Sequence, residues 1–214
     1  MCGRLAAYIE GPARVRLRVP VPLETEMEVR RTSTGVEMLH AGALVAEASP
    51  ADVTPEFPAA PSYAEAEAAA RSYRGFRNHP FPACFVCGPQ RTASDGLRIF
   101  AGPLPGGEIV AAPWIPDASL GDANGIVRSE FVWAALDCPG AYAAPVPEGT
   151  PMLLGELAAS LGGRIAAGER CIVVGWGLRR DGRRHFMGTA LFAENGERRA
   201  TARATWFEAA RSPR

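Results

Sequence analysis

Two stretches of the chain resemble each other, and such an internal repeat restricts the fold more than any single motif does. In each copy a helix is followed by three strand-like runs, the first helix at Cys2–Ile9 and the second at Ser129–Cys138. The copies close alike, on Ala43–Glu47 and on Ala190–Glu194, each downstream of an Arg-Arg pair and a turn. Self-similarity of this kind is typical of a duplicated unit. The order of elements predicts an α+β protein built from two related units.

The two units are unequal in length. The second has further strand-like runs in front, at Gly96–Phe100 and Glu108–Trp114, whereas the first starts in mid-helix at Met1. An incomplete first unit would leave apolar surface or a strand edge unpaired, so we expect a homodimer or higher self-association, or a native start upstream of Met1. The predicted division is a partial, N-terminally truncated unit at 1–48, a Pro-rich linker with a short helix at 49–79, a complete unit at 80–208 and a tail at 209–214.

Composition excludes several classes of partner. The 214 residues carry 23 basic and 23 acidic side chains, and this zero net charge argues against general nucleic-acid binding, which needs a basic surface. No apolar run is long enough to span a bilayer, so we expect no membrane partner. Five cysteines form no regular disulfide framework, which favours a reducing cytoplasm.

The second helix contains the most informative single residue, Asp137. Ser129 and Glu130 give this helix a start, with a capping hydroxyl and an acid in the first turn. Asp137 is a lone carboxylate among apolar residues, and Pro139 breaks the helix directly after it. A buried, unpaired carboxylate is costly, so it needs a reason to be there. Asp137 is therefore either a functional base or only the cap of a helix that restarts at Pro139.

Two short motifs resemble those of a known superfamily. The run from Cys84 to Gly88, followed by Asp95-Gly96-Leu97, resembles the opening of hotdog-fold thioesterase-like domains. Ala135-Leu136-Asp137 is similar to the helix of double-hotdog acyl-CoA thioesterases of the thioesterase II type. The resemblance covers residues 80–208 and, more faintly, 2–48. It implies a hotdog fold, a long helix wrapped by an antiparallel sheet, in a degenerate double-hotdog arrangement.

The resemblance also implies an activity. In those enzymes the matching Asp helps to activate the water that cleaves the thioester. The resemblance therefore implies that this protein hydrolyses an acyl-CoA or another acyl thioester, with Asp137 activating the water and without a cofactor. Backbone N–H groups around Gly125 to Glu130 could stabilise the oxyanion. The Thr and Gln that the family also uses fall near Leu178 and Ala204, which cannot do that work. The alternative is therefore a non-catalytic acyl-ligand binding or assembly protein on the same scaffold.

A turn rich in arginine offers a second possible contact with such a ligand. Four guanidinium groups surround the Asp181-Gly182 turn, those of Arg179, Arg180, Arg183 and Arg184. Guanidinium pairs with phosphate in a bidentate way, so these residues are weak candidates for the phosphates of coenzyme A. The alternative is a solvated hairpin tip, because charged turns are common.

The cysteine motif leaves a metal site open. Cys84 and Cys87 have metal-ligand spacing, His79 is close by, and Cys138 could join them only if the fold brings it near. One such pair is weak evidence, since free cysteines are often simply buried apolar residues. We expect no metal, with both cysteines of the motif reduced and packed under the entrance to the second unit.

Overall fold

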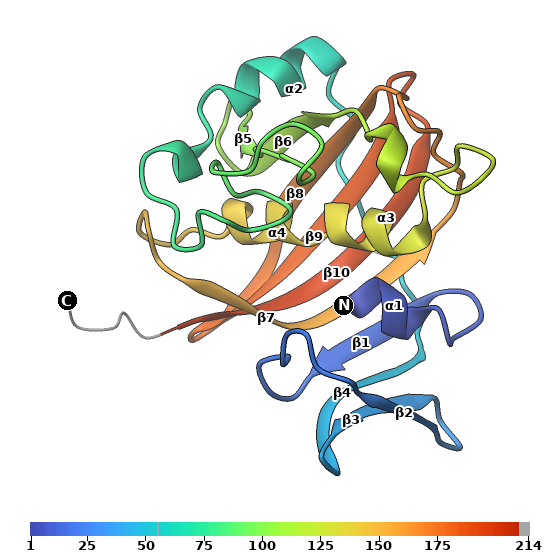
Figure 1. The fold of residues 1–214 in the computed structure, drawn as a ribbon. Helices are drawn as coiled ribbons and strands as arrows, with labels where there is room; N and C mark the ends of the chain where they lie inside the picture. The colour runs from blue at the N-terminus through green and yellow to red at the C-terminus, as the bar shows by residue number, and fades with distance from the viewer. Residues whose placement is uncertain (55, 210–214) are drawn as a thin grey trace.

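A computed structural model describes residues 1–54 and 56–209 of the chain, which form one ten-stranded antiparallel sheet with helices on both faces (Figure 1). The strands lie in the order β2-β3-β4-β1-β7-β10-β9-β8-β6-β5. The first unit contributes β1 (Ala13–Leu17), β2 (Glu28–Arg31), β3 (Val36–His40) and β4 (Ala43–Pro50). The second contributes β5 (Gly102–Pro103), β6 (Ile109–Trp114), β7 (Met152–Leu161), β8 (Cys171–Asp181), β9 (Arg184–Ala193) and β10 (Arg198–Glu208).

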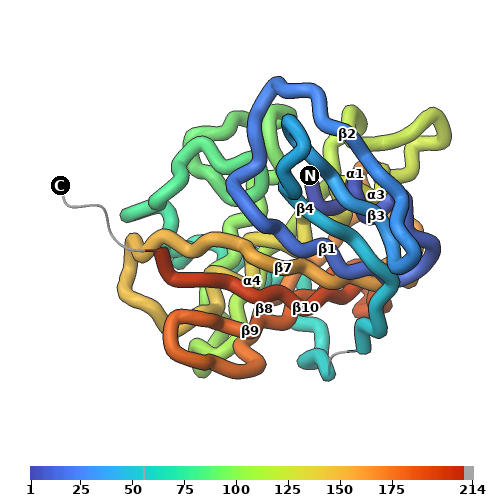
Figure 2. Tube along the Cα trace, turned by 90° about the horizontal axis from the view of Figure 1, so that it is seen from below, coloured from blue at the N-terminus to red at the C-terminus, as the bar shows by residue number. Residues whose placement is uncertain are grey.

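Within the sheet, the two units are joined along a single strand pair, β1 against β7 (Figure 2). Ala13 lies opposite Ala159 and Arg16 opposite Glu156 in this antiparallel register. The guanidinium of Arg16 also contacts the Glu156 carboxylate at 2.7 Å. The apolar side chains of β1 and β7 that face the helices, among them Val15 and Leu157, belong to the same buried core. The repeat predicted from the sequence is thus one continuous sheet rather than two separate domains.

The helices lie on opposite faces of this sheet. On one face α3 (Ser129–Ala135) and α4 (Cys138–Ala143) pack over the strands of the second unit, and α1 (Cys2–Ala6) packs against α3. On the other face α2 (Tyr63–Ala70) covers β6. Two single turns of 3-10 helix complete the elements, at Arg74–Phe76 and Ala118–Leu120. A sheet wrapped around a central helix is the hotdog arrangement, so the predicted α+β fold is confirmed.

The helix α4 approaches the sheet so closely that only a glycine fits beneath it. A Cβ at Gly175 in β8 would lie 2.5 Å from the carbonyl oxygen of Pro139 and 3.0 Å from the backbone nitrogen of Gly140. Both atoms belong to backbone, which cannot move aside as a flexible side chain can. Gly175 therefore fixes the height of α4 above the sheet.

Replacing Gly175 with Ala should force α4 away from β8. Overpacking of this kind typically costs about 1–3 kcal/mol, so we expect a lower melting temperature for Gly175→Ala in calorimetry. Gly177→Ala in the same strand is the matched control, because the nearest atom to its added Cβ is 4.0 Å away. Equal melting temperatures for the two variants would contradict this account.

Several predicted elements differ from those observed. The strand expected at Gly96–Phe100 is absent, and this segment is an irregular run whose Leu97 and Ile99 N–H groups bond the carbonyls of Phe85 and Val86. The N-terminal helix ends at Ala6, three residues early. Ser129 is the first helical residue rather than the cap, which is Arg128 and makes no side-chain capping bond. Of the predicted tail, residues 210–214 lie outside the described residues.

The outer strand of the first unit is strongly charged. Strand β2 exposes Glu28, Arg30 and Arg31, and Arg30 pairs with Glu37 of β3 at 2.6 Å. Charged edges of this kind oppose strand pairing between copies. The predicted self-association would therefore have to use another surface. Light scattering, which measures the molecular mass in solution, tests it. Within the described residues no helix is long and apolar enough to cross a membrane.

Candidate functional site

The central helix breaks at Leu136 and Asp137, the two residues between α3 and α4. Pro139 lies in the first turn of α4, where its missing N–H is tolerated. Asp137 occupies the N-cap position with φ −78° and ψ −83°, and its side chain makes no capping hydrogen bond. The interpretation of Asp137 as only a helix cap is therefore wrong.

The carboxylate of Asp137 has an unusual environment. The residue as a whole is half-buried, but its Oδ1 is fully buried and has no hydrogen-bond partner. Among the described residues, the only other buried side-chain nitrogen or oxygen atoms without a hydrogen-bond partner are Arg199 Nε and Trp206 Nε1. Burial, with a smaller contribution from the Cys84 sulfur, raises the pKa of Asp137 to about 7. A group of this kind is a candidate for chemistry because it stays costly until something binds it.

Asp137 and Trp206 both line a cavity of about 350 Å³ under α4. This volume lies within the range of small-molecule sites. Most of its wall is apolar, from Pro80, Phe81, Ala141, Pro147, Met152, Leu153 and Leu154. Arg74, His79, Cys84 and Cys87 line it from the segment before residue 88, and Cys138 lines it from α4. The cavity thus combines a largely apolar lining with two residues, Asp137 and Trp206, that each have a buried polar atom without a partner.

A second hollow of about 690 Å³ lies on the other side of Asp137, between α1, α3 and β7. Apolar side chains form most of its wall, among them Leu17, Trp133 and Leu157. The two hollows share four wall residues, which are Cys84, Asp137, Leu153 and Leu154. Asp137 therefore stands at the boundary between two spaces, which suits a ligand with two chemically different halves.

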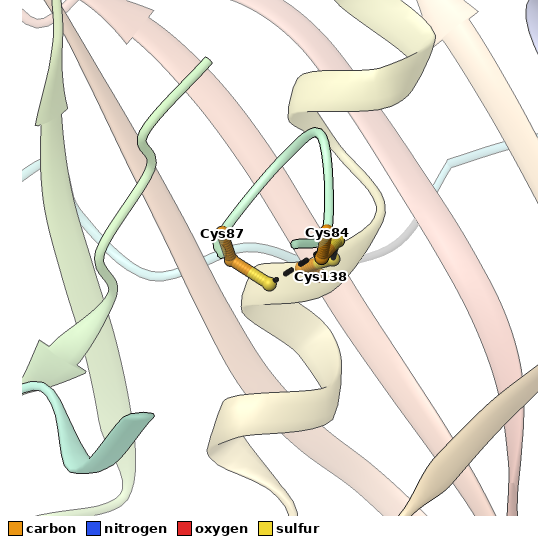
Figure 3. Close-up of side chains that lie close together, drawn as sticks. All are labelled: Cys84, Cys87 and Cys138. Carbon is orange, nitrogen blue, oxygen red and sulfur yellow. Dashed lines mark hydrogen bonds between the residues drawn. The ribbon is translucent and has the colours of Figure 1, made fainter. Parts of the chain in front are cut away.

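The three cysteines of the predicted site meet at this same place (Figure 3), and His79 lies beside them. The Cys84 sulfur lies 3.6 Å from that of Cys87 and 3.7 Å from that of Cys138. His79 Nε2 lies 3.4 Å from the Cys87 sulfur. The condition placed on Cys138 is therefore met, because α4 carries it directly beneath the loop that bears the other two cysteines.

The four hairpin arginines lie elsewhere. Arg179 stacks over Phe186, Arg180 contacts Glu208 at 2.9 Å and Arg184 contacts Asp181 at 2.6 Å. None of them, Arg183 included, is among the residues that line the cavity beside Asp137. The guanidinium found there is that of Arg74, which donates to the carbonyls of α4 and the turn after it, those of Ala141, Ala144 and Val146.

Three of the expected backbone donors just before the helix are already occupied. The N–H groups of Ile126, Val127 and Arg128 bond Asp122 Oδ1 and the carbonyls of Ile165 and Leu120. The prediction that these groups hold an oxyanion is therefore wrong for all three. The sequence analysis missed Arg74 and Trp206, which no local motif distinguishes from ordinary arginine and core tryptophan.

The two strand positions where the family's Thr and Gln were expected to fall are Leu178 and Ala204. Leu178 and Ala204 line a separate hollow with Thr205, not the cavity beside Asp137. The hydroxyl of Thr201 donates to the carbonyl of Thr189, whose own hydroxyl donates to the carbonyl of Leu136 at 2.7 Å. These two threonines therefore hold the end of α3 in place and leave Asp137 unpartnered.

No family model and no curated protein matches this sequence. Among solved structures, the TesB protein of Mycobacterium avium subspecies paratuberculosis is 15% identical, with a TM-score of 0.54 over 96% of this chain and 82% of that one. The match spans both units and their shared sheet. The chain is a double hotdog.

Shorter solved proteins match about half of this double hotdog. Zebrafish thioesterase superfamily member 2 is 15% identical, with a TM-score of 0.44 over 48% of this chain and 75% of its own. A Streptococcus mutans protein solved with acetyl-CoA is 9% identical, with a TM-score of 0.45 over 50% of this chain and 85% of its own.

Proposed function

We propose that this double hotdog hydrolyses an acyl thioester, with acyl-CoA as the substrate class and Asp137 as the base that activates water. One observation carries the proposal: Asp137 Oδ1 and Trp206 Nε1 are buried and unpartnered, and both residues line the same largely apolar cavity. One is an acceptor and the other a donor. Thioester hydrolysis needs both, a base for the water and a donor for the developing oxyanion.

The reaction assigns a role to each group. Asp137 takes a proton from water, and the resulting hydroxide attacks the carbonyl carbon. The Trp206 N–H donates to the oxygen that becomes negative, in a space where low polarity strengthens that bond. The tetrahedral intermediate then loses its C–S bond, and the proton that Asp137 took from water passes to the leaving thiolate, which departs as the free thiol. The two hollows that meet at Asp137 would separate the acyl group from the thiol portion.

The rival function is a protein that binds an acyl ligand without cleaving it. It is favoured because neither Leu178 nor Ala204, the positions expected to match the polar pair of the resembling enzymes, supplies a polar side chain to the cavity, and Thr201 is also outside it. Under this alternative the same cavity binds the ligand, and the missing partners leave the water poorly oriented.

A panel of acyl-CoA substrates of increasing chain length separates the two functions. Hydrolysis releases a free thiol that a chromogenic disulfide detects, and calorimetry measures binding of the same compounds. We expect turnover of at least one acyl-CoA. Saturable binding without thiol release from any of them would establish the rival function instead.

The hairpin arginines remain a prediction for the coenzyme A phosphates. If they bind those phosphates, an acyl-pantetheine thioester, which lacks the nucleotide, should show a higher KM than the corresponding acyl-CoA. Neutralising Arg179, Arg180, Arg183 and Arg184 together should remove that difference. Equal KM values for the two substrates in the parent protein would assign these arginines to a solvated hairpin tip.

A further inference from the structure

Three cysteines form a compact cluster beside the cavity. Their sulfur atoms all lie within 4.8 Å of one another, although Cys138 is 54 residues from Cys84 in the chain (Figure 3). Cys84 lies 3.6 Å from Cys87 and 3.7 Å from Cys138, sulfur to sulfur, and both distances are far longer than the S–S bond of about 2.05 Å in a disulfide. The sulfurs therefore face a common point without being bonded to one another.

These separations match the dimensions of a tetrahedral zinc–thiolate site. Zinc binds thiolate sulfur at about 2.3 Å, which places two sulfurs of a tetrahedron about 3.8 Å apart. The observed separations differ from this value by about 0.2 Å or less. The third pair, Cys87 and Cys138, lies within 4.8 Å, so an ion bound by all three sulfurs would need at most about 1 Å of closure between these two.

The backbone around Cys84 supports the same conclusion. The N–H of Gly88 donates to the carbonyl of Cys84 at 2.9 Å, closing a tight turn. This turn holds the sulfurs of Cys84 and Cys87 3.6 Å apart.

Gly88 is required by this turn. A Cβ at position 88 would lie 2.5 Å from the backbone nitrogen of Cys84 and 2.5 Å from the carbonyl oxygen of Pro82. The Cys-x-x-Cys-Gly sequence is thus folded so that two sulfurs project to one side and meet the third, on α4. A buried apolar pair of cysteines needs no such arrangement.

His79 lies next to the cluster without completing it. Its Nδ1 accepts the backbone N–H of Phe81 at 2.9 Å, which leaves the proton of a neutral ring on Nε2. That nitrogen lies 3.4 Å from the Cys87 sulfur and can donate to it. Hydrogen bonds of this kind hold and tune a metal-bound ligand without coordinating the ion.

We infer that this chain binds one zinc ion through the thiolates of Cys84, Cys87 and Cys138, and that His79 donates a hydrogen bond to the Cys87 sulfur. The fourth coordination position is left to a ligand from the cavity, which all three cysteines line. This conclusion replaces the expectation from the sequence, which was that no metal is bound. It does not depend on the proposed hydrolysis, because zinc content is measured without substrate.

The test is elemental analysis of the full chain, purified without added metal and dialysed. We expect about one zinc per chain in the parent. Cys84→Ser and Cys138→Ser should each lose it, whereas Cys171→Ser should keep it because this buried thiol lies in β8 and outside the cluster. Cobalt added to the zinc-free protein should produce thiolate-to-metal charge-transfer absorption that only the first two variants lack.

Three results would overturn the inference. One is a folded parent, checked by circular dichroism, that binds neither zinc nor cobalt and has five titratable thiols. Another is three titratable thiols without metal, which would identify a disulfide within the cluster. The third is retention of zinc in both cluster variants.

The role of His79 has its own test. His79→Ala should keep one zinc per chain but bind it about 10–100-fold more weakly in competition with a chelating dye, as for other groups that support a metal ligand. Complete loss of zinc in this variant would instead make His79 the fourth ligand and overturn the open position.

Discussion

Asp137→Asn should lose thioester hydrolysis by about 10²–10⁴-fold in kcat while still binding acyl-CoA. The amide keeps the shape of the carboxylate and can no longer accept a proton from water. Because Oδ1 is buried and has no partner, the substitution breaks no hydrogen bond made by that atom. The variant should therefore melt no lower than the parent, so that a loss of rate cannot be attributed to unfolding.

Glu130→Gln is the matched control for this variant. Glu130 is the other carboxylate on the central helix, at its first turn, and it lies 3.9 Å from the guanidinium of Arg128. Glu130 lines the second hollow, so its loss can change KM, but kcat should stay within about twofold because a partly exposed ion pair of this length contributes little. Unchanged kcat in Asp137→Asn, measured on the best substrate of the panel, would remove Asp137 from the reaction.

Trp206→Phe should lower kcat by about 10²–10³-fold, which is the usual effect of removing one oxyanion donor. Phenylalanine keeps an aromatic ring in the same packing and removes only the indole N–H with part of the ring. Binding of a substrate analogue should change far less than turnover, because the donor is needed most when the carbonyl oxygen becomes negative.

Trp176→Phe supplies the comparison. Trp176 is similarly buried, but it belongs to the core on the opposite face of the sheet, under α2. Both variants lose the same atoms, so both should lose similar stability from packing. A fall in kcat that is equal in the two variants would show that Trp206 acts through stability alone.

Much of the fold follows from local patterns in the sequence. The Asp181-Gly182 turn specifies the β8–β9 hairpin, and Gly182 has the positive φ of 57° that such turns require. The capping box of Ser62 and Glu65 begins α2, the short helix that was predicted within residues 49–79. Pro139 after a lone carboxylate correctly indicates the break in the central helix. Each of these signals acts within a few residues, where chemistry and geometry are directly linked.

The candidate site was only partly predictable, because it depends on contacts between distant segments. Asp137 could be chosen from its own helix, but Trp206 reaches the cavity through the register of β10 against β7 and β9. Cys138 joins the cysteine motif only because α3 ends before it and α4 turns its side chain beneath the loop. The missing strand at Gly96–Phe100 has a similar cause, since its N–H groups bond that same loop instead of a neighbouring strand.

The strand pair that unites the two units also determines when the first unit can finish folding. Arg16 and Glu156 are 140 residues apart, and closing so long a loop is entropically unfavourable and slow. During synthesis, β1 therefore leaves the ribosome with one edge unpaired, and α1 emerges well before the α3 surface that it packs against. The first unit therefore depends on α3 and β7 of the second unit for its final structure. Until then it exposes a strand edge that is a natural target for a chaperone, and a chain cut short before β7 should aggregate rather than accumulate as a folded half.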